Sequence, residues 1–392
     1  MSDHKLATNA LHAGHDIAAN GGTQAVPIYQ TSSYVFNDSD HAANLFSLKE
    51  LGFIYTRLNN PTNQILQERL ASLEGGIGAV VFASGTSAIS TGLLTLLKAG
   101  DHIVASSSLY GGTYNLLSVT LPRLGITTTF VDASNPDNFK AAVQDNTRAF
   151  FVESLGNPKL DVLDIEAIAV HSKAAGVPFI VDNTVATPAL LNPIKHGANI
   201  VIHSLTKYIG GQGTSLGGAI IDAAYTFKLI LEGLRDFGGA LSPFNAFQII
   251  QGLETLPIRI KQHSENALEI AKWLEAQDQI AWVNYPGLES SKYKALADKY
   301  LPKGQSGIVT FGHKGGYDAA KKIADNTKLF SLLANIGDTK SLIIHPGSTT
   351  HQQLDEAEQA SAGVSGDLIR LSVGIEDIDD LKADLQAAFD TI

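Results

Sequence analysis

Lys207 stands where an apolar, strand-like run ends in a glycine-rich turn. The run covers residues 200–203, Ser204 follows it, and Thr206 directly precedes the lysine. A lysine side chain at such a turn contributes little to the packing of the core. Its amine can instead form a Schiff base with a carbonyl cofactor. The hydroxyls of Ser204 and Thr206 can donate hydrogen bonds to a phosphate of the same cofactor. The pattern alone leaves a non-catalytic lysine in a turn as the alternative.

Asp182 ends a second apolar run, residues 179–182, and precedes Lys207 by 25 positions. Because this spacing fits one strand–connection–strand unit, we expect both residues at the carboxyl ends of nearby parallel strands, where ligands bind. A carboxylate there can keep the pyridine nitrogen of pyridoxal phosphate protonated, so that the ring accepts negative charge. The alternative is an aspartate that caps a turn or a helix.

Two glycine-containing turns could complete such a cofactor site. Ser84-Gly85-Thr86 lies between an apolar run and a helical stretch. Free N–H groups at a helix start bind phosphate, and glycine lets the backbone approach it. Tyr110 precedes a glycine pair, and its ring could stack on a flat cofactor. A capped helix start and a structural tyrosine explain the same residues without function, and neither turn matches a Walker or dinucleotide fingerprint.

Two arginines are candidates for binding anionic groups. Tyr55 and Arg57 are two positions apart on an extended segment, so their hydroxyl and guanidinium can point the same way toward a phosphate. Arg370 stands in an otherwise apolar strand, where a lone arginine must be paired or functional. The carboxylate of a substrate suits its planar fork, and an internal salt bridge is the alternative.

The elements that must position these residues alternate between strands and helices. Helical spacing covers residues 64–73 and 164–175, and the predicted strands are 79–83, 102–105, 128–131, 150–153, 179–182, 200–203 and 218–221. Apolar strands that alternate with helices predict an α/β fold whose mostly parallel sheet is covered on both faces.

The pattern divides the chain into three parts. We expect an irregular N-terminal arm (1–60), a large cofactor-binding α/β domain (61–245) and a smaller C-terminal α+β domain (246–392). In the last part, a long amphipathic stretch from about 246 to 277 is interrupted near Pro257. It precedes strands at 280–285, 307–311 and 342–345 and helices at 317–326 and 378–389.

The composition excludes several classes of function. The chain has 392 residues, with 28 Lys and Arg against 39 Asp and Glu, and a net charge of −11. A chain this acidic is a poor binder of nucleic-acid backbones. It has no Cys, which removes disulfides, thiolate metal sites and Cys nucleophiles, and we expect no metal centre. No apolar run approaches the ~20 residues that span a bilayer, and no signal segment is visible, so we expect a cytoplasmic protein.

Together these segments resemble the Cys/Met-metabolism family of pyridoxal-phosphate enzymes, which have fold type I. The resemblance covers almost the whole chain. It rests on Tyr55-Thr-Arg57-x-x-Asn-Pro-Thr62, Ser84-Gly85, Tyr110-Gly-Gly-Thr113, Glu153-Ser-x-x-Asn-Pro158, Val181-Asp-Asn-Thr184, His203-Ser-x-Thr-Lys-Tyr208 and Ile369-Arg-Leu-Ser-Val-Gly-Ile-Glu376. Four further segments are similar to the sulfhydrylase branch of the family: Leu241-Ser-Pro-Phe-Asn-Ala246, Gln251-Gly-Leu-Glu-Thr-Leu256, Asn284-Tyr-Pro-Gly287 and Ser341-Leu-Ile-Ile-His-Pro346.

The resemblance implies a role for each matched residue. Lys207 would carry the covalent bond to pyridoxal 5′-phosphate, Asp182 would pair with the ring nitrogen, and Tyr110 would stack on the ring. The phosphate would be held by Gly85, Thr86, Ser204 and Thr206, and by Tyr55 and Arg57 of a neighbouring subunit. The substrate carboxylate would be held by Arg370 and Ser341, with Asn157 near both the ring and the carboxylate. Family members commonly form tetramers of two dimers, so the resemblance implies a homotetramer with shared active sites.

The activity that the resemblance implies is γ-replacement. An O-acylated homoserine, O-acetyl-L-homoserine in the sulfhydrylase branch, would lose its acyloxy group from Cγ as a carboxylate (acetate) and take up sulfide there, giving L-homocysteine for methionine biosynthesis. Alternatives within the family are an O-succinyl donor, cystathionine γ-synthesis and a γ-lyase. Gly112 stands where methionine γ-lyases often have Cys, which argues against lyase action on methionine. The segment 221–237 is short compared with many sulfhydrylases, which leaves the acyl group open.

Two alternatives lie outside the family. A nicotinamide dehydrogenase would share the doubly wound sheet, but the chain lacks the GxGxxG motif. A cofactor-free structural or binding protein is the other alternative.

Overall fold

Within the described part of the chain, the larger of two β-sheets has seven strands, which confirms the expected α/β fold. The computed structural model describes residues 4–350, 352 and 363–392. The strand order is β1-β7-β6-β5-β4-β2-β3, and β7 runs in the direction opposite to the other six strands. The strands are β1 (Gly78–Phe82), β2 (His102–Ser106), β3 (Thr127–Val131), β4 (Thr147–Glu153), β5 (Phe179–Asp182), β6 (Ile200–Ser204) and β7 (Gly218–Asp222).

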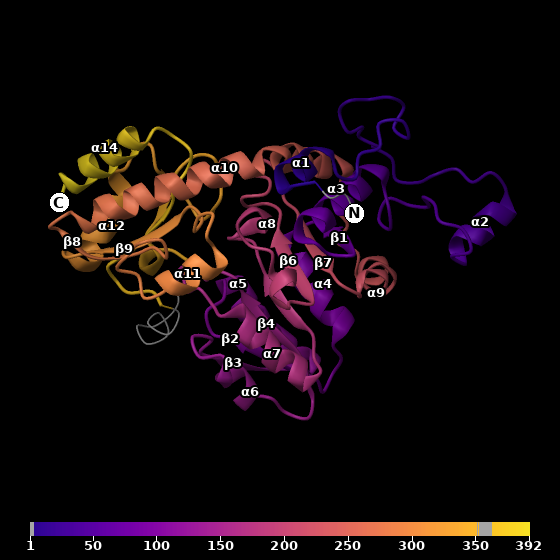
Figure 1. Ribbon diagram of the computed structural model, residues 1–392, viewed down its shortest axis with the longest axis horizontal. Helices are drawn as coiled ribbons and strands as arrows, with labels where there is room; N and C mark the ends of the chain where they lie inside the picture. The colour runs from indigo at the N-terminus through magenta and orange to yellow at the C-terminus, as the bar shows by residue number, and fades with distance from the viewer. Residues whose placement is uncertain (1–3, 351, 353–362) are drawn as a thin grey trace.

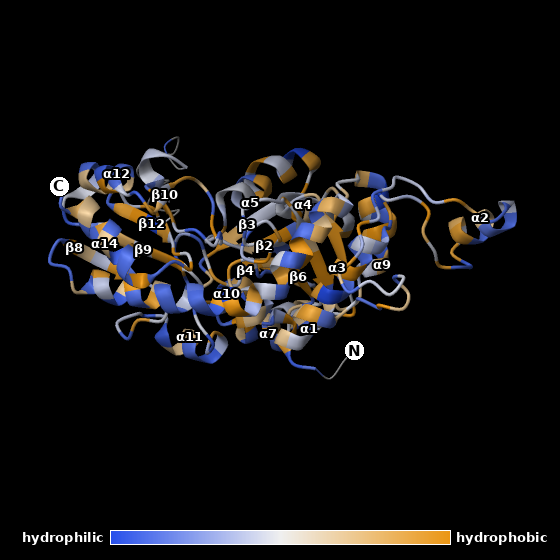
Figure 2. Cartoon of the chain, turned by 90° about the horizontal axis from the view of Figure 1, so that it is seen from above, coloured by the Kyte–Doolittle hydropathy of each residue, from blue (hydrophilic) through white to orange (hydrophobic). Residues whose placement is uncertain are grey.

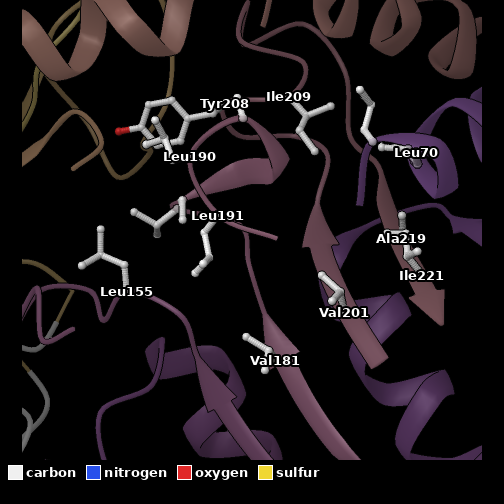
Figure 3. Packing of buried hydrophobic residues seen from close by; sticks show 14 of the residues in the cluster. Leu70, Leu155, Val181, Leu190, Leu191, Val201, Tyr208, Ile209, Ala219 and Ile221 are labelled. Atoms are coloured by element: carbon white, nitrogen blue, oxygen red, sulfur yellow. The ribbon is translucent and has the colours of Figure 1, made fainter. Parts of the chain in front are cut away.

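Alternate residues of these strands pack into two separate cores, one on each face of the sheet. Val181, Val201 and Ile221 belong to one core, shown in Figure 3. Ile180 and Ile202 belong to the other. Because both faces are buried, the strands read as continuous apolar runs rather than as alternating ones. The apolar strands lie inside a more polar shell of helices in Figure 2.

Helices on both faces of the sheet bring loops to its carboxyl edge. They include α3 (Pro61–Glu74), α4 (Gly85–Leu96), α5 (Gly111–Asn115), α6 (Asp137–Ala141), α7 (Ile165–Ala175), α8 (Thr187–Leu190) and α9 (Thr226–Lys228). The local sequence sets the ends of α3, since the Asn60 side chain accepts a hydrogen bond from Thr62 N–H and Pro61 opens the helix. Gly75, with a φ of 79°, ends α3 in a left-handed conformation that favours glycine.

A single helix, α10 (Pro243–Glu275), joins the two sheets and runs along one side of both in Figure 1. The expected interruption near Pro257 is wrong, because the 33-residue helix continues through it. Proline removes one backbone N–H donor and normally kinks a helix. Here Leu253, Leu256 and Ile260 around Pro257 are buried in the core of the large sheet, and this packing holds the helix together.

The second sheet has five strands in the order β10-β11-β12-β9-β8, all antiparallel except the β10–β11 pair. The elements are β8 (Ile280–Asn284), β9 (Ile308–His313), β10 (Ser331–Leu332), β11 (Leu342–Ile344), β12 (Leu368–Ser372), α11 (Lys294–Tyr300), α12 (Gly316–Asn326) and α14 (Ile378–Phe389). The second half of α10 packs on this sheet through Ile270 and Leu274.

The N-terminal segment is less irregular than expected, because it contains α1 (Leu6–His12) and α2 (Ser39–Phe46). Both helices are too short to show a clear 3.6-residue period in the sequence. α1 lies against α3 and α10 with Ala10 fully buried, whereas α2 projects away from the body of the molecule (Figure 1). None of the helices in the described part of the chain has the length and apolar character needed to cross a bilayer.

Candidate active site

A cavity of about 280 Å³ opens at the carboxyl ends of β4, β5 and β6, facing β12. It brings together most of the site residues predicted from the sequence, namely Gly85, Thr86, Tyr110, Asn157, Asp182, Ser204, Thr206, Lys207 and Arg370. Glu153, Thr184 and Asn335 also line it, although the sequence analysis gave them no role. Three predicted residues, Tyr55, Arg57 and Ser341, do not line it.

One end of the cavity is the start of α4. Ser84 caps this helix by accepting a hydrogen bond from Ser87 N–H. A Cβ atom on Gly85 would lie 2.7 Å from Ser204 Cβ, so only glycine allows the helix to approach β6 this closely. The first N–H groups of a helix have no partner within the helix and bind anions. This end of the cavity therefore fits a phosphate.

Asp182 ends β5 and is oriented by Thr184. Its Oδ1 accepts hydrogen bonds from Thr184 N–H at 3.0 Å and from Thr184 Oγ1 at 2.6 Å. Thr184 Oγ1 in turn accepts from Ser204 N–H at 2.8 Å, which ties β5 to β6. Burial raises the pKa of Asp182, and the Thr184 bonds and nearby His203 oppose that rise. The carboxylate is thus held rigidly toward the cavity.

Asn335 connects the two cationic side chains of the cavity. Lys207 Nζ donates to Asn335 Oδ1 at 2.6 Å, and Arg370 Nη2 donates to the backbone oxygen of Asn335 at 3.2 Å. Arg370 Nη1 donates to Asn157 Oδ1 at 3.1 Å. Burial lowers the pKa of Lys207, and the positive charge of Arg370 lowers it further. A lowered pKa favours the neutral amine, which can act as a base or a nucleophile.

Arg370 is a cation without an anionic partner in the described part of the chain. No carboxylate lies within 4.0 Å of its guanidinium there, and its Nε is buried without a hydrogen-bond partner. Burial lowers its pKa to about 10. Leaving a guanidinium in this state costs free energy that an incoming anion recovers. The internal salt bridge that the sequence left open is not present among these residues.

Tyr110 and Glu153 both line the cavity and are joined by a hydrogen bond. Tyr110 N–H donates to Glu153 Oε1 at 2.6 Å, which fixes the backbone at the start of α5. The tyrosine side chain is 56% exposed and lines the cavity, so its ring is free to contact a ligand.

The predicted residues outside the cavity have other contacts. Arg57 is exposed and donates from Nη1 to the backbone oxygen of Arg235, and its guanidinium lies 5.8 Å from the ring of Tyr55. Ser341 is fully buried, and both its N–H and its Oγ donate to the Glu376 carboxylate, at 2.6 and 2.9 Å.

Of the three cavity residues that the sequence analysis gave no role, two had a signal in the sequence and one did not. Glu153 and Thr184 stand within two of the quoted motifs, so their position at strand ends could have identified them. Asn335 lies between β10 and β11 in a segment without regular periodicity, and nothing in the sequence places it beside Lys207.

Comparisons with known proteins agree with this geometry. Residues 7–390 match the family described as Cys/Met metabolism PLP-dependent enzyme. An O-acetyl-L-homoserine sulfhydrylase from Leptospira meyeri is 52% identical, with 99% of this chain and 97% of that protein covered. A homocysteine synthase from Schizosaccharomyces pombe is 48% identical, with 98% and 97% covered.

A solved structure is similar over nearly the full length. It is described as a putative O-acetylhomoserine (thiol)-lyase from Campylobacter jejuni and carries N′-pyridoxyl-lysine-5′-monophosphate. It superposes with a TM-score of 0.96 at 42% identity, covering 99% of this chain and all of that one. The resemblance inferred from the motifs is therefore confirmed at the level of the family.

The cavity fits pyridoxal phosphate on its own structural grounds. It offers an amine at Lys207, a carboxylate at Asp182 for a ring nitrogen, an aromatic ring at Tyr110 and a helix start at Gly85 for a phosphate. Its volume is close to the lower limit of about 300 Å³ for small-molecule sites. The fit of the cavity and the match over residues 7–390 lead to one conclusion: the chain belongs to the Cys/Met metabolism family of PLP-dependent enzymes.

Proposed function

We propose that this protein replaces the acetoxy group on Cγ of O-acetyl-L-homoserine with sulfide, which yields L-homocysteine and acetate in methionine biosynthesis. Relatives at 46–52% identity that bear sulfhydrylase and homocysteine synthase names support the choice of reaction. The structural observation that carries the proposal is the Arg370–Asn335–Lys207 chain of hydrogen bonds. It sets an anion-binding group and a base at a fixed separation within one cavity.

Arg370 binds the α-carboxylate of the amino-acid substrate. Its planar guanidinium presents donors in a geometry that matches a carboxylate, and Asn157 and Asn335 hold that plane in place. Because a bound carboxylate fixes one end of the substrate, Cα and Cβ come to lie within reach of Lys207.

Lys207 moves protons during the reaction. Once its amine is free, it takes the proton from Cα and then one from Cβ, and it returns a proton when sulfide has added. Burial and Arg370 lower the pKa of Lys207, which favours the unprotonated amine that such a base requires. When bound, pyridoxal phosphate supplies an electron sink for the charge that develops at Cα.

Asp182 and Tyr110 hold the ring of the cofactor, the first at its nitrogen and the second by stacking. Gly85, Thr86, Ser204 and Thr206 surround the phosphate at the start of α4. Ser341 is included in the substrate site because the family motif implies it. Its N–H and its Oγ both donate to Glu376, so its contacts add no support of their own.

Tyr55 and Arg57 reach the phosphate of a neighbouring subunit. Both are exposed and lie outside the cavity of their own chain, which agrees with a role in another copy. We extend the proposal to a homotetramer built from dimers with shared active sites, acting in the cytoplasm on small molecules without nucleic acid or membrane partners. We also propose that the chain is organised as an N-terminal arm (1–60), a large domain (61–245) and a C-terminal domain (246–392), as the sequence pattern indicates.

The test is a matrix of steady-state kcat/KM values for purified holoenzyme. Donors are O-acetyl- and O-succinyl-L-homoserine, and nucleophiles are sulfide, methanethiol and L-cysteine. We expect the O-acetyl donor with sulfide to exceed every other pair by about tenfold or more, which corresponds to about 1.4 kcal/mol of transition-state binding. A higher value for the succinyl donor, or for L-cysteine, would reassign the enzyme to another activity of the same family.

A further inference from the structure

Two carboxyl groups end neighbouring strands beside the cofactor site. Glu153 of β4 is paired in parallel register with Asp182 of β5, so the two residues occupy the same level of the sheet. Both line the cavity. Glu153 is buried and Asp182 is half-buried, and two like charges on paired strand positions raise the free energy of the state in which both are ionised.

The hydrogen bonds around the two groups are unequal. Asp182 Oδ1 accepts two, both from Thr184, and His203 on the next strand, β6, adds a favourable electrostatic interaction with the Asp182 anion. Glu153 is buried and accepts one, from Tyr110 N–H. Since donors to a carboxylate stabilise its ionised form, Asp182 is the better place for the negative charge.

Two acidic groups in the described part of the chain act on Glu153. They are Asp182 on β5 and Asp161 in the segment after β4, and both disfavour an anion at Glu153. The two cations that line the cavity, Lys207 and Arg370, donate to Asn335 and Asn157. Burial is the largest cause that raises the pKa of Glu153 well above its usual value, followed by Asp182.

We propose that Glu153 is a positioning residue that stays a neutral carboxylic acid at neutral pH, so that Asp182 is the single anion at the cofactor's ring nitrogen. Through Oε1, the same neutral group holds the backbone of Tyr110, whose ring faces the cavity. This inference rests on the part of the proposed function that places pyridoxal phosphate in this cavity. It does not depend on which acyl donor the enzyme uses. Its test therefore uses no turnover measurement, and its failure is distinct from a failure of the proposed reaction.

The experiment compares two isosteric variants, Glu153→Gln and Asp182→Asn, with a third variant, Glu153→Ala. Gln reproduces the shape and neutrality of a protonated glutamate and keeps an oxygen for Tyr110 N–H. Each apoenzyme is titrated with pyridoxal phosphate to obtain its Kd. In parallel, infrared difference spectra at neutral pH record the carbonyl stretch of a protonated carboxylic acid.

We expect Glu153→Gln to bind pyridoxal phosphate within about threefold of the unmodified chain, whereas Asp182→Asn binds about tenfold or more weakly, because it loses a charge-assisted hydrogen bond. Glu153→Ala should also bind more weakly, since it loses the acceptor for Tyr110 N–H, and Gln should rescue that loss. The carboxylic-acid band should vanish in Glu153→Gln and persist in Asp182→Asn.

Three outcomes would overturn the proposal. The first is a Kd for Glu153→Gln as weak as that for Asp182→Asn. The second is the absence of a carboxylic-acid band that the Glu153→Gln substitution removes. The third is failure of Glu153→Gln to fold, because a neutral isostere that cannot replace Glu153 would show that its negative charge is required.

Discussion

Lys207 Nζ and Asn335 Oδ1 are joined by a hydrogen bond of 2.6 Å, so a neutral amide is the acceptor that orients the Lys207 amine. An amide oxygen accepts an N–H without carrying a charge. A carboxylate at the same place would favour the ammonium form and so would weaken Lys207 in the role of base that we propose for it. The choice of Asn therefore orients Lys207 while leaving its pKa low.

Replacing Asn335 tests this relationship. Asn335→Asp should raise the pKa of Lys207, so the acidic limb of the kcat–pH profile should move to higher pH and kcat at neutral pH should fall. Asn335→Ala should reduce kcat about tenfold at the pH optimum without an upward shift of that limb, because it removes orientation and adds no charge. The two full pH profiles provide the measurement. Identical shifts in the two variants would show that the charge at this position is irrelevant.

Lys207→Ala should abolish turnover but not cofactor binding. The start of α4 and Asp182 remain, so pyridoxal phosphate should still bind, without a covalent link that borohydride can trap. We expect kcat to fall by about 10²–10⁴-fold or more, since the base is lost. Lys340→Ala, at an exposed lysine, is the control that should behave like the unmodified chain. A near-normal kcat for Lys207→Ala would refute the assignment.

Arg370→Lys should act mainly on substrate binding. Lysine keeps the positive charge but loses the bidentate fork and the bonds to Asn157 and Asn335. We expect KM for O-acetyl-L-homoserine to rise about tenfold, with a smaller change in kcat. Arg123→Lys, at an exposed arginine, is the matched control. An unchanged KM would mean that Arg370 serves the fold rather than the substrate.

Mixing two inactive variants tests the shared active site. In a mixed dimer of Arg57→Ala and Lys207→Ala, one site carries both lesions and the other carries neither. After dissociation and random reassociation, activity should return to about a quarter of that of the unmodified enzyme. Subunit exchange must be verified separately, for example with two affinity tags. If exchanged dimers remain inactive, Arg57 acts in its own subunit.

His263 makes stability depend on pH. Its Nδ1–H donates to the Val373 backbone oxygen at 2.7 Å, its Nε2 is buried without a partner, and burial lowers its pKa to about 4. Between pH 6.5 and 4 the unfolded chain binds a proton that the folded chain does not. Stability therefore falls as pH decreases through this range, by about 3 kcal/mol at most.

The variant His263→Gln should weaken this dependence, because the amide donates to Val373 without titrating. The measurement is the apparent Tm at pH 7.5 and at pH 5. The decrease between the two should be smaller in His263→Gln than in the unmodified chain. His12→Gln, at an exposed histidine, should keep the full decrease. Equal decreases in both variants would contradict the assignment to His263.

The large sheet was predictable because its strands are buried on both faces. β5 was predicted at residues 179–182 and occupies them, since a buried parallel strand is a continuous apolar run bounded by polar residues. The course of α10 was not predictable, because the local preference of Pro257 and the packing of its neighbours oppose each other. Only the tertiary contacts of Leu253, Leu256 and Ile260 show which effect is larger.

The positions of site residues at the ends of strands could be predicted from the sequence. Asp182 and Lys207 could be brought together from the sequence, because parallel neighbouring strands place their carboxyl ends at one edge. Loop residues could not be placed in this way. Ser341 remains a prediction, whereas Asn335, six positions earlier, contacts both Lys207 and Arg370 in the structure.

Part of the core beneath the seven-stranded sheet comes from residues that the ribosome synthesises well after the strands of that sheet. Besides the strands, it contains Tyr300, Ile308 and Ile336, and the last of these follows the end of β7 at Asp222 by 114 positions. At about 5–20 residues per second, synthesis of that interval takes roughly 6 to 23 seconds. Throughout it, one face of a fully synthesised sheet lacks part of its apolar cover. The nascent chain is consequently most prone to aggregation after the strands that line the cavity have been made and before its last third has emerged.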